Sequence, residues 1–438
     1  MALNTRIGPT ALAAALGLAA LASAGSAHAV LCSDVKTSVL ANNPAAHFIF
    51  GSGGSAITPT LARVAYILST KANPPIFVFY QDGGGAVVGY QSFTQGTGGT
   101  SSRPFRYWTS EADVTGTSPT CTADASTGQA VDFATTGGTL DLFAGQTLAD
   151  DVGVFTGPTQ GVNVVVPWAS TETSINTEAL YYVFGLGEAA DYSGIANPIP
   201  WKTKAYIFRR SATAFVQQFL RGAIQTLGDK AANFPAGFDA GTASSPDTNQ
   251  GTVDNVIAAA GTNHAQEAIG FTSGPTAEKN RGPGKIHYLA YQHVGQTEAY
   301  FPDSTSDAFD KINIRNGHYF LWDTNQFFTK INGSNANPTL DQIANPDVQA
   351  FIGYFSGELS FPDNAVTKGV IDSGSIPQCA MQVKRSSDFK GLSCYAPADP
   401  CGCYFDSIAT GTTSCDACTT DAQCSGSSKC HFGFCEAY

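Results

Sequence analysis

A turn rich in glycine and serine, residues 51–55, is the first stretch that could hold a small anion. It follows a short apolar run and leads at once into a helical pattern of apolar residues over 61–68. Glycine lets the backbone turn sharply and approach a ligand closely. The helix that follows presents unpaired amides and the positive end of its dipole. An ordinary strand-to-helix turn fits the same pattern, and a Walker A loop does not, because no Gly-Lys-[Ser/Thr] follows. The candidate ligand-binding residues of this turn are Ser52, Gly54, Ser55 and the amide of Ala56.

A second candidate lies at residues 209–213, where a predicted strand over 205–208 ends and a predicted amphipathic helix over 212–227 begins. Arginine offers a planar fork of donors that suits an oxyanion, and hydroxyls beside helix amides add further donors. A capped helix with two surface arginines is the alternative. In doubly wound sheets, ligands bind at the carboxyl ends of strands. This position favours an oxyanion-binding site over a capped helix. Its candidate residues are Arg210, Ser211 and Thr213.

Two further turns repeat this arrangement of a strand followed by a polar, glycine-rich turn. A β-rich run over 75–80 is followed by Asp82 and Gly83, and a short strand over 130–134 is followed by Thr135 and Thr136. Because such turns recur at strand ends, we expect them to share one pocket.

The elements that position these turns alternate between strand and helix along the chain. We predict strands over 162–166 and 268–272, and helices over 176–184, 251–259 and 346–355. This alternation is typical of a mostly parallel, doubly wound α/β architecture.

The N-terminus has the pattern of an export signal. Arg6 precedes an apolar stretch over 11–24, which ends in the small-x-small sequence Ala27-His28-Ala29. We therefore expect a signal peptide over 1–29 and a periplasmic or extracellular protein. The sequence shows no apolar segment long enough to cross a bilayer, so we predict no membrane insertion. The formal net charge of −12 argues against a nucleic-acid partner.

The eleven cysteines are unevenly spread. Cys32 and Cys121 stand alone, and the other nine lie between Cys379 and Cys435. In an exported chain they predict disulfides, with one cysteine unpaired or intermolecular. Some spacings in this region resemble those of zinc ligands, but the compartment favours disulfides. We predict no metal and no cofactor.

The candidate turns resemble, in chain order, motifs of the phosphate-type substrate-binding proteins of bacterial ABC importers. The likeness covers roughly residues 46–360. The similar motifs are 51–56 (G-A-G-A-[ST]-F in the family), 131–137 (V-D-F-G-A-S-D), 176–187 with Pro200-Trp201 (ETLADIFLG…W), 210–213 (R-x-x-x-S-G-T) and 268–271 (A-I-G-Y).

The resemblance implies a two-lobed, periplasmic-binding-protein type II fold with a cleft between the lobes. The crossover strands are expected near 162–166 and 285–289. The implied division is a signal peptide (1–29), lobe 1 (30–163 and 288–372), lobe 2 (164–287) and a cysteine-rich C-terminal module (373–438). Ser55 and the Ala56 amide would hold the anion from lobe 1, and Arg210, Ser211 and Thr213 from lobe 2.

Two positions depart from the family pattern. Asp82 stands where the family has Ser, and Gly137 stands where the family has the acid that accepts a proton from the anion. One hypothesis is that Asp82 replaces the missing carboxylate. The competing hypothesis is that an acid beside the ligand excludes phosphate.

These observations predict an exported binding protein for a small oxyanion, phosphate first, with an ABC permease as a candidate partner. The first alternative is a secreted cell-surface or matrix protein that keeps the fold without serving a transporter. The cysteine-rich tail favours that alternative. A secreted phosphoester hydrolase is the other alternative, but no nucleophile and base can be nominated from the sequence, so we do not predict an enzyme.

Overall fold

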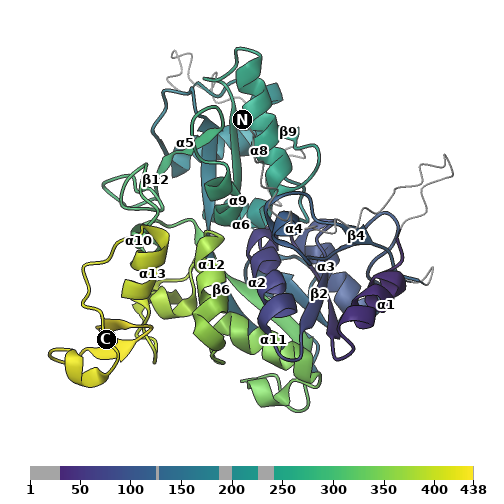
Figure 1. The fold of residues 1–438 in the computed structure, drawn as a ribbon. Helices are drawn as coiled ribbons and strands as arrows, with labels where there is room; N and C mark the ends of the chain where they lie inside the picture. Colours follow the sequence, from purple (N-terminus) through teal and green to yellow (C-terminus); the bar gives the residue numbers. More distant parts are fainter. Residues whose placement is uncertain (1–29, 125–127, 187–199, 225–240, 438) are drawn as a thin grey trace, which may run out of the picture.

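The computed structural model describes residues 30–124, 128–186, 200–224 and 241–437. The signal peptide predicted over 1–29 lies outside the described residues. Figure 1 shows two lobes, with the C-terminal module in yellow beside them.

One mixed sheet runs through both lobes. Its strands are β1 (His47–Gly53), β2 (Ile76–Gln81), β3 (Phe105–Arg106), β4 (Thr120–Cys121), β5 (Phe133–Thr136), β6 (Val152–Pro167), β8 (Ile207–Arg209), β9 (Thr242–Ala243), β10 (Ile269–Ser273), β11 (Ile286–Tyr288) and β13 (Trp322–Lys330). The strand order is β4-β3-β2-β1-β5-β13-β6-β10-β8-β9, and β11 also pairs with β6. Strand β1 is parallel to β2 and β5, and β8 is parallel to β10 and β9. The predicted α/β fold is confirmed, with antiparallel strands β13 and β6 at the centre of the sheet.

Strand β6 joins the two lobes (Figure 1). Residues 152–161 of this strand pair with β13, and residues 162–167 pair with β10 and β11. The strand predicted over 162–166 is therefore the second half of a longer strand, and it crosses between the lobes as expected.

The return crossover lies later in the chain than predicted. Strand β11 pairs with the second-lobe half of β6, so residues 285–289 stay in lobe 2. Next, β12 (Ala290–Gln292) pairs with β7 (Ser174–Asn176), and Arg281 binds Asp303 at 3.0 Å. The chain returns to lobe 1 at β13. The boundary predicted at residue 288 therefore moves to about Trp322, because these pairings hold the intervening segment to lobe 2.

Helices cover both lobes. They are α1 (Cys32–Asn42), α2 (Thr58–Lys71), α3 (Gly85–Gln95), α4 (Glu111–Thr115), α5 (Thr177–Leu180), α6 (Phe215–Ala223), α8 (Asn249–Gly261), α9 (Gly274–Lys279), α10 (Ile312–Arg315), α11 (Pro346–Ser356), α12 (Ala365–Asp372) and α13 (Gly402–Ala409). A core under α2, α11 and α12 includes the buried Leu61, Val64 and Phe351. The apolar spacing over 61–68 thus marks the buried face of α2. Within the described residues, none of the helices combines the length and apolarity needed to span a membrane.

Two predicted helices begin at other residues in the structure. The helix predicted from Ala212 begins at Phe215, which leaves Ser211 and Thr213 in the preceding turn. The predicted end of that helix, near Leu227, lies outside the described residues. The helix predicted from Gly251 begins at Asn249, where Thr248 is the N-cap and accepts a hydrogen bond from the Gly251 amide.

The C-terminal module is held by four disulfides. The pairs are Cys379–Cys401, Cys403–Cys415, Cys418–Cys430 and Cys424–Cys435, and a fifth disulfide joins Cys32 to Cys121. The exposed Cys394 is the unpaired cysteine. Five disulfides are typical of a protein that folds outside the cytoplasm.

Candidate functional site

The first glycine-rich turn is packed closely against helix α3. The fully buried Ser52 donates its hydroxyl to the carbonyl of Gly89 at 2.6 Å. A Cβ at Gly89 would lie 2.3 Å from the backbone of Gly53, so glycine is needed where helix and strand meet. In the structure Ser52 therefore serves this contact and does not face a cleft.

Thr135 and Thr136 join the strand ends to each other. Thr135 shares a 2.6 Å hydrogen bond with the hydroxyl of Tyr80, which also donates to the carbonyl of Gly54 at 3.0 Å. Thr136 donates to the carbonyl of Gly138. Burial raises the pKa of Tyr80, so its hydroxyl stays protonated and able to donate. Both threonines are buried, and their hydroxyls are taken by protein partners.

Arg210 is buried in an ion pair that the sequence did not reveal. Its Nε donates to Oδ1 of Asp247 at 2.7 Å, and its Nη2 donates to the Asp247 carbonyl at 2.9 Å. The Ser211 amide also donates to Asp247, and the Ser211 and Thr213 hydroxyls lie 2.9 Å apart. Burial opposes the charged form of Asp247, but the charge of Arg210 and the hydrogen bonds from Ser211 lower its pKa. The guanidinium predicted to bind an anion is thus already neutralised.

The space between the strand ends, where the resemblance places the anion, is filled by residues 213–215. The amide of Val87 in α3 donates to the carbonyl of Thr213 at 3.4 Å. A Cβ at Gly85, which has φ of 83°, would lie 2.5 Å from that carbonyl oxygen. A Cβ at Gly137 would lie 2.2 Å from the ring of Phe215. Phe215 therefore leaves no room for a side chain at residue 137, where the resemblance leads us to expect an acidic one.

Asp82 is tied to neighbours within its own lobe. Its two oxygens accept from Nε of Arg106 at 3.0 and 3.1 Å, and its Oδ2 accepts from the Thr58 hydroxyl at 3.1 Å. Gly83 lies beside Arg103. The Asp82 carboxylate is therefore an ion-pair partner in this structure, and its oxygens are not left open for a protonated ligand.

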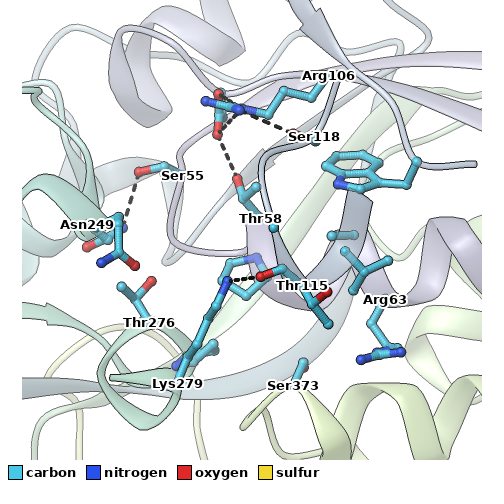
Figure 2. A pocket seen from close by; sticks show the side chains of 18 of the residues that line it. Ser55, Thr58, Arg63, Arg106, Thr115, Ser118, Asn249, Thr276, Lys279 and Ser373 are labelled. Atoms are coloured by element: carbon cyan, nitrogen blue, oxygen red, sulfur yellow. Dashed lines mark hydrogen bonds and ion pairs between the residues drawn. The ribbon is translucent and has the colours of Figure 1, made fainter. Parts of the chain in front are cut away.

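A cleft of about 470 Å³ lies beside the filled space, between α2 and α4 of lobe 1 and α8 and α9 of lobe 2 (Figure 2). We call it the side cleft. Ser55 and Asp82 are the predicted site residues that line it. Across it, Nδ2 of Asn249 donates to the Ser55 hydroxyl at 3.2 Å, and the Lys279 ammonium donates to the Thr115 carbonyl at 3.2 Å. Ala56 is buried, and Ser52, Gly54, Gly83, Thr135, Thr136, Arg210, Ser211 and Thr213 lie outside the lining.

Three of the four carboxylates that line the side cleft are paired with a basic side chain, and the fourth is Asp113. Asp82 binds Arg106, Glu278 binds Lys311, and Asp372 binds Lys368. Although burial works against the charged form of Asp113, hydrogen bonds from Thr109 and Ser110 lower its pKa.

Lys279 differs from the other basic residues of the side cleft. Arg63 binds Glu111 at 2.5 Å and Arg106 binds Asp82, whereas the structure records for Lys279 only the hydrogen bond to Thr115. Within the described residues, it is the basic side chain of the lining that has no carboxylate partner. Its positive charge is therefore available to a ligand.

Two helices from different lobes begin at the side cleft. Helix α2 starts at Thr58 and helix α8 starts at Asn249, and both residues belong to the lining. The positive ends of their dipoles add to the charge of Lys279. The arrangement favours a ligand that carries negative charge.

Sequence reasoning missed Arg106, Asn249 and Lys279. The sequence over 94–126 is rich in glycine, serine and threonine and predicts a surface loop or insertion, but its described residues contain β3, α4 and β4. The sequence over 239–250 predicts a loop, but Asn249 and Gln250 already belong to α8. The helical start at Asn249 has a local signal, the Thr248 N-cap, but nothing local shows which way these side chains face.

Known proteins resemble the chain only in structure. No family model matches it, and no curated protein matches its sequence significantly. An ABC-type phosphate transport receptor from Vibrio cholerae is 15% identical, and the match covers 75% of this chain and 99% of that chain, with a TM-score of 0.44. A putative phosphate ABC transporter substrate-binding protein with bound phosphate from Clostridium perfringens is 10% identical (76% and 99% covered, TM-score 0.44). A phosphate-binding protein from Stenotrophomonas maltophilia is 11% identical (75% and 90% covered, TM-score 0.42).

Proposed function

We propose that this chain is an exported solute-binding protein that holds a small oxyanion, phosphate first, in the side cleft between its lobes. The observation that carries the proposal is the Lys279 ammonium, which extends toward Thr115 in Figure 2 without a carboxylate partner among the described residues. An anion bound there would gain a charge-assisted hydrogen bond. A transport role with a membrane permease belongs to the same proposal.

Contacts across the side cleft support a ligand that holds the lobes together. Asn249 reaches Ser55, and Lys279 reaches the Thr115 carbonyl, so donors of lobe 2 already meet acceptors of lobe 1. An anion between them would offer stronger acceptors than a hydroxyl or a carbonyl. Binding would then favour the closed arrangement by hinge closure.

Calorimetry with inorganic phosphate and sulfate tests the proposal, using the Lys279→Gln variant. We expect phosphate to bind the wild type and to bind Lys279→Gln about ten- to a hundredfold more weakly, because hydrogen bonds to charged groups contribute about 1.5–3 kcal/mol. Lys330→Gln is the matched control, since Lys330 binds Asp151 in a surface pair away from the cleft lining. Equal affinity in Lys279→Gln and wild type, or no heat with either anion, would reject the proposal.

The second candidate is a secreted surface or matrix protein that keeps the fold without serving a transporter. The pairing of the buried Arg210 with Asp247 and the Phe215 ring at Gly137 favour it, because they close the place where the resemblance puts the anion. The same calorimetry separates the two candidates. Silence with both anions favours this second one.

A further inference from the structure

We infer that the ligand of the side cleft is an organic oxyanion, in which one anionic head such as a phosphate monoester carries an uncharged and partly apolar body. The inference rests on the proposed function and narrows its ligand class. Its first support is size. The volume of about 470 Å³ lies within the range of about 300–1,000 Å³ that holds drug-sized ligands, and it exceeds the needs of a single tetrahedral oxyanion.

One basic side chain of the side cleft is available to an anionic head. Arg63 and Arg106 are already paired with carboxylates, which leaves Lys279 as the basic group of the lining available to a ligand. Lys279 donates to the Thr115 carbonyl, which carries no net charge. An anionic head can therefore replace this carbonyl as the acceptor. A ligand with several negative charges far apart would find paired carboxylates and apolar side chains at its other end.

The wall between these groups is apolar. Trp108 and Ala62 are each 3% exposed, and Val114 is half-buried on α4 beside them. Pro59 adds to this wall from α2, and Pro275 adds to it from α9 of the other lobe. An inorganic anion in the cleft would leave the exposed parts of Val114 and Pro59 in contact with water. An apolar body displaces that water and so adds affinity that the anion alone cannot gain.

Calorimetry with inorganic phosphate and n-butyl phosphate tests the inference on the full chain. We expect butyl phosphate to bind the wild type at least tenfold more tightly than phosphate. Val114→Thr keeps the volume of the side chain but adds a hydroxyl to the wall. It should remove most of that advantage and leave phosphate affinity unchanged. Pro275→Ser tests the wall from the other lobe, and Lys279→Gln should weaken both ligands by the same factor.

The outcomes separate this inference from the proposed function. If phosphate binds as tightly as butyl phosphate, or if neither wall variant changes their ratio, the inference of an organic body is wrong while anion binding stands. If neither ligand binds, or if Lys279→Gln binds both as well as the wild type does, the proposed function fails as well. Melting temperatures of the variants without ligand show whether each of them is folded.

Discussion

A buried pair of carboxyl groups, Asp323 and Asp388, lies where the chain crosses back into lobe 1. Asp323 is 8% exposed, its Oδ1 accepts from the Thr324 amide, and its Oδ2 has no donor within the described residues. Asp388 comes from the C-terminal module and accepts from the Thr139 amide at 3.0 Å. Burial lowers the pKa of the neighbouring Arg385 to about 10, so Arg385 is still charged at neutral pH. One cation then faces two carboxyl groups, which favours the protonated form of the buried Asp323.

This pair makes stability depend on pH with a defined sign. The pKa of Asp323 is raised well above its ordinary value of 3.8. Burial is the largest cause, and the neighbouring Asp388 adds to it. The folded state therefore holds its proton more tightly than the unfolded state does. The resulting stabilisation is complete below pH 3.8 and is lost as the pH rises toward the raised pKa.

Asp323→Asn should stabilise the protein at neutral pH, because an amide donates to Asp388 without ionising. We expect a gain of roughly 1–3 kcal/mol at pH 8 that shrinks toward pH 4. Urea unfolding across this range measures the free energy of unfolding. Asp341→Asn, at an exposed site, is the control and should show no such trend. A constant difference between Asp323→Asn and wild type would contradict a raised pKa of Asp323.

At the scale of elements, the end of β5 and the start of α6 close the space between the strand ends. Phe215 is 2% exposed and stands against Gly137 and Gly138, and the Thr213 carbonyl accepts from α3. The glycine at 137 thus has a packing reason, since no side chain fits in front of the ring. The glycine at residue 137 and the burial of Phe215 therefore depend on each other.

Gly137→Ala should therefore destabilise the protein by about 1–3 kcal/mol, the usual cost of overpacking a core. The measurement is again urea unfolding. Gly261→Ala is the control, because a Cβ there meets nothing within 4 Å and Gly261 is the last residue of α8. Adding Phe215→Leu should recover part of the loss in Gly137→Ala, since the smaller side chain leaves room for the methyl group. Equal and additive losses would show that the two residues do not compete for space.

Local sequence patterns were sufficient to predict the bounds of elements that end in a turn or begin with a cap. The strand over 75–80 and the helix from Pro346 were predicted within one or two residues, because their apolar spacing and flanking turns are local signals. The partners of the site were not predictable in this way. Asp247 meets Arg210 across 37 positions, and Asn249 meets Ser55 across 194. The first pairing depends on how lobe 2 folds, and the second depends on how the two lobes meet.

At the scale of the whole molecule, the C-terminal module contacts both lobes. Phe389, which has φ of 59°, packs against Phe219 of α6 with ring centroids 4.9 Å apart. The adjacent Asp388 binds Thr139 of lobe 1. Figure 1 shows α13 of the module beside α10 of lobe 2. Because one short segment touches both lobes, the module restrains their relative movement, and a ligand-driven hinge motion has to work against these contacts.

Arg315 of α10 is the main polar link between lobe 2 and the module. It is 3% exposed, its Nη1 binds Asp406 at 2.5 Å, and its Nε donates to the Ala380 carbonyl at 3.0 Å. Its guanidinium also lies 4.8 Å from the ring centroid of Phe405. Replacing Arg315 leaves the half-buried Asp406 carboxylate and the Ala380 carbonyl without this donor.

Arg315→Gln should therefore lower the free energy of unfolding by roughly 1.5–3 kcal/mol, because the Asp406 carboxylate left behind is partly exposed to solvent. The whole chain, and not the module alone, should become less stable, because the module is packed into the core of lobe 2 through Phe405. Differential scanning calorimetry should show one transition for the wild type and an earlier one for the variant. Lys330→Gln, which breaks a surface pair with Asp151, should leave the transition almost unchanged. A separate low-temperature transition in the wild type would mean that the module unfolds by itself, and then it could not restrain the lobes.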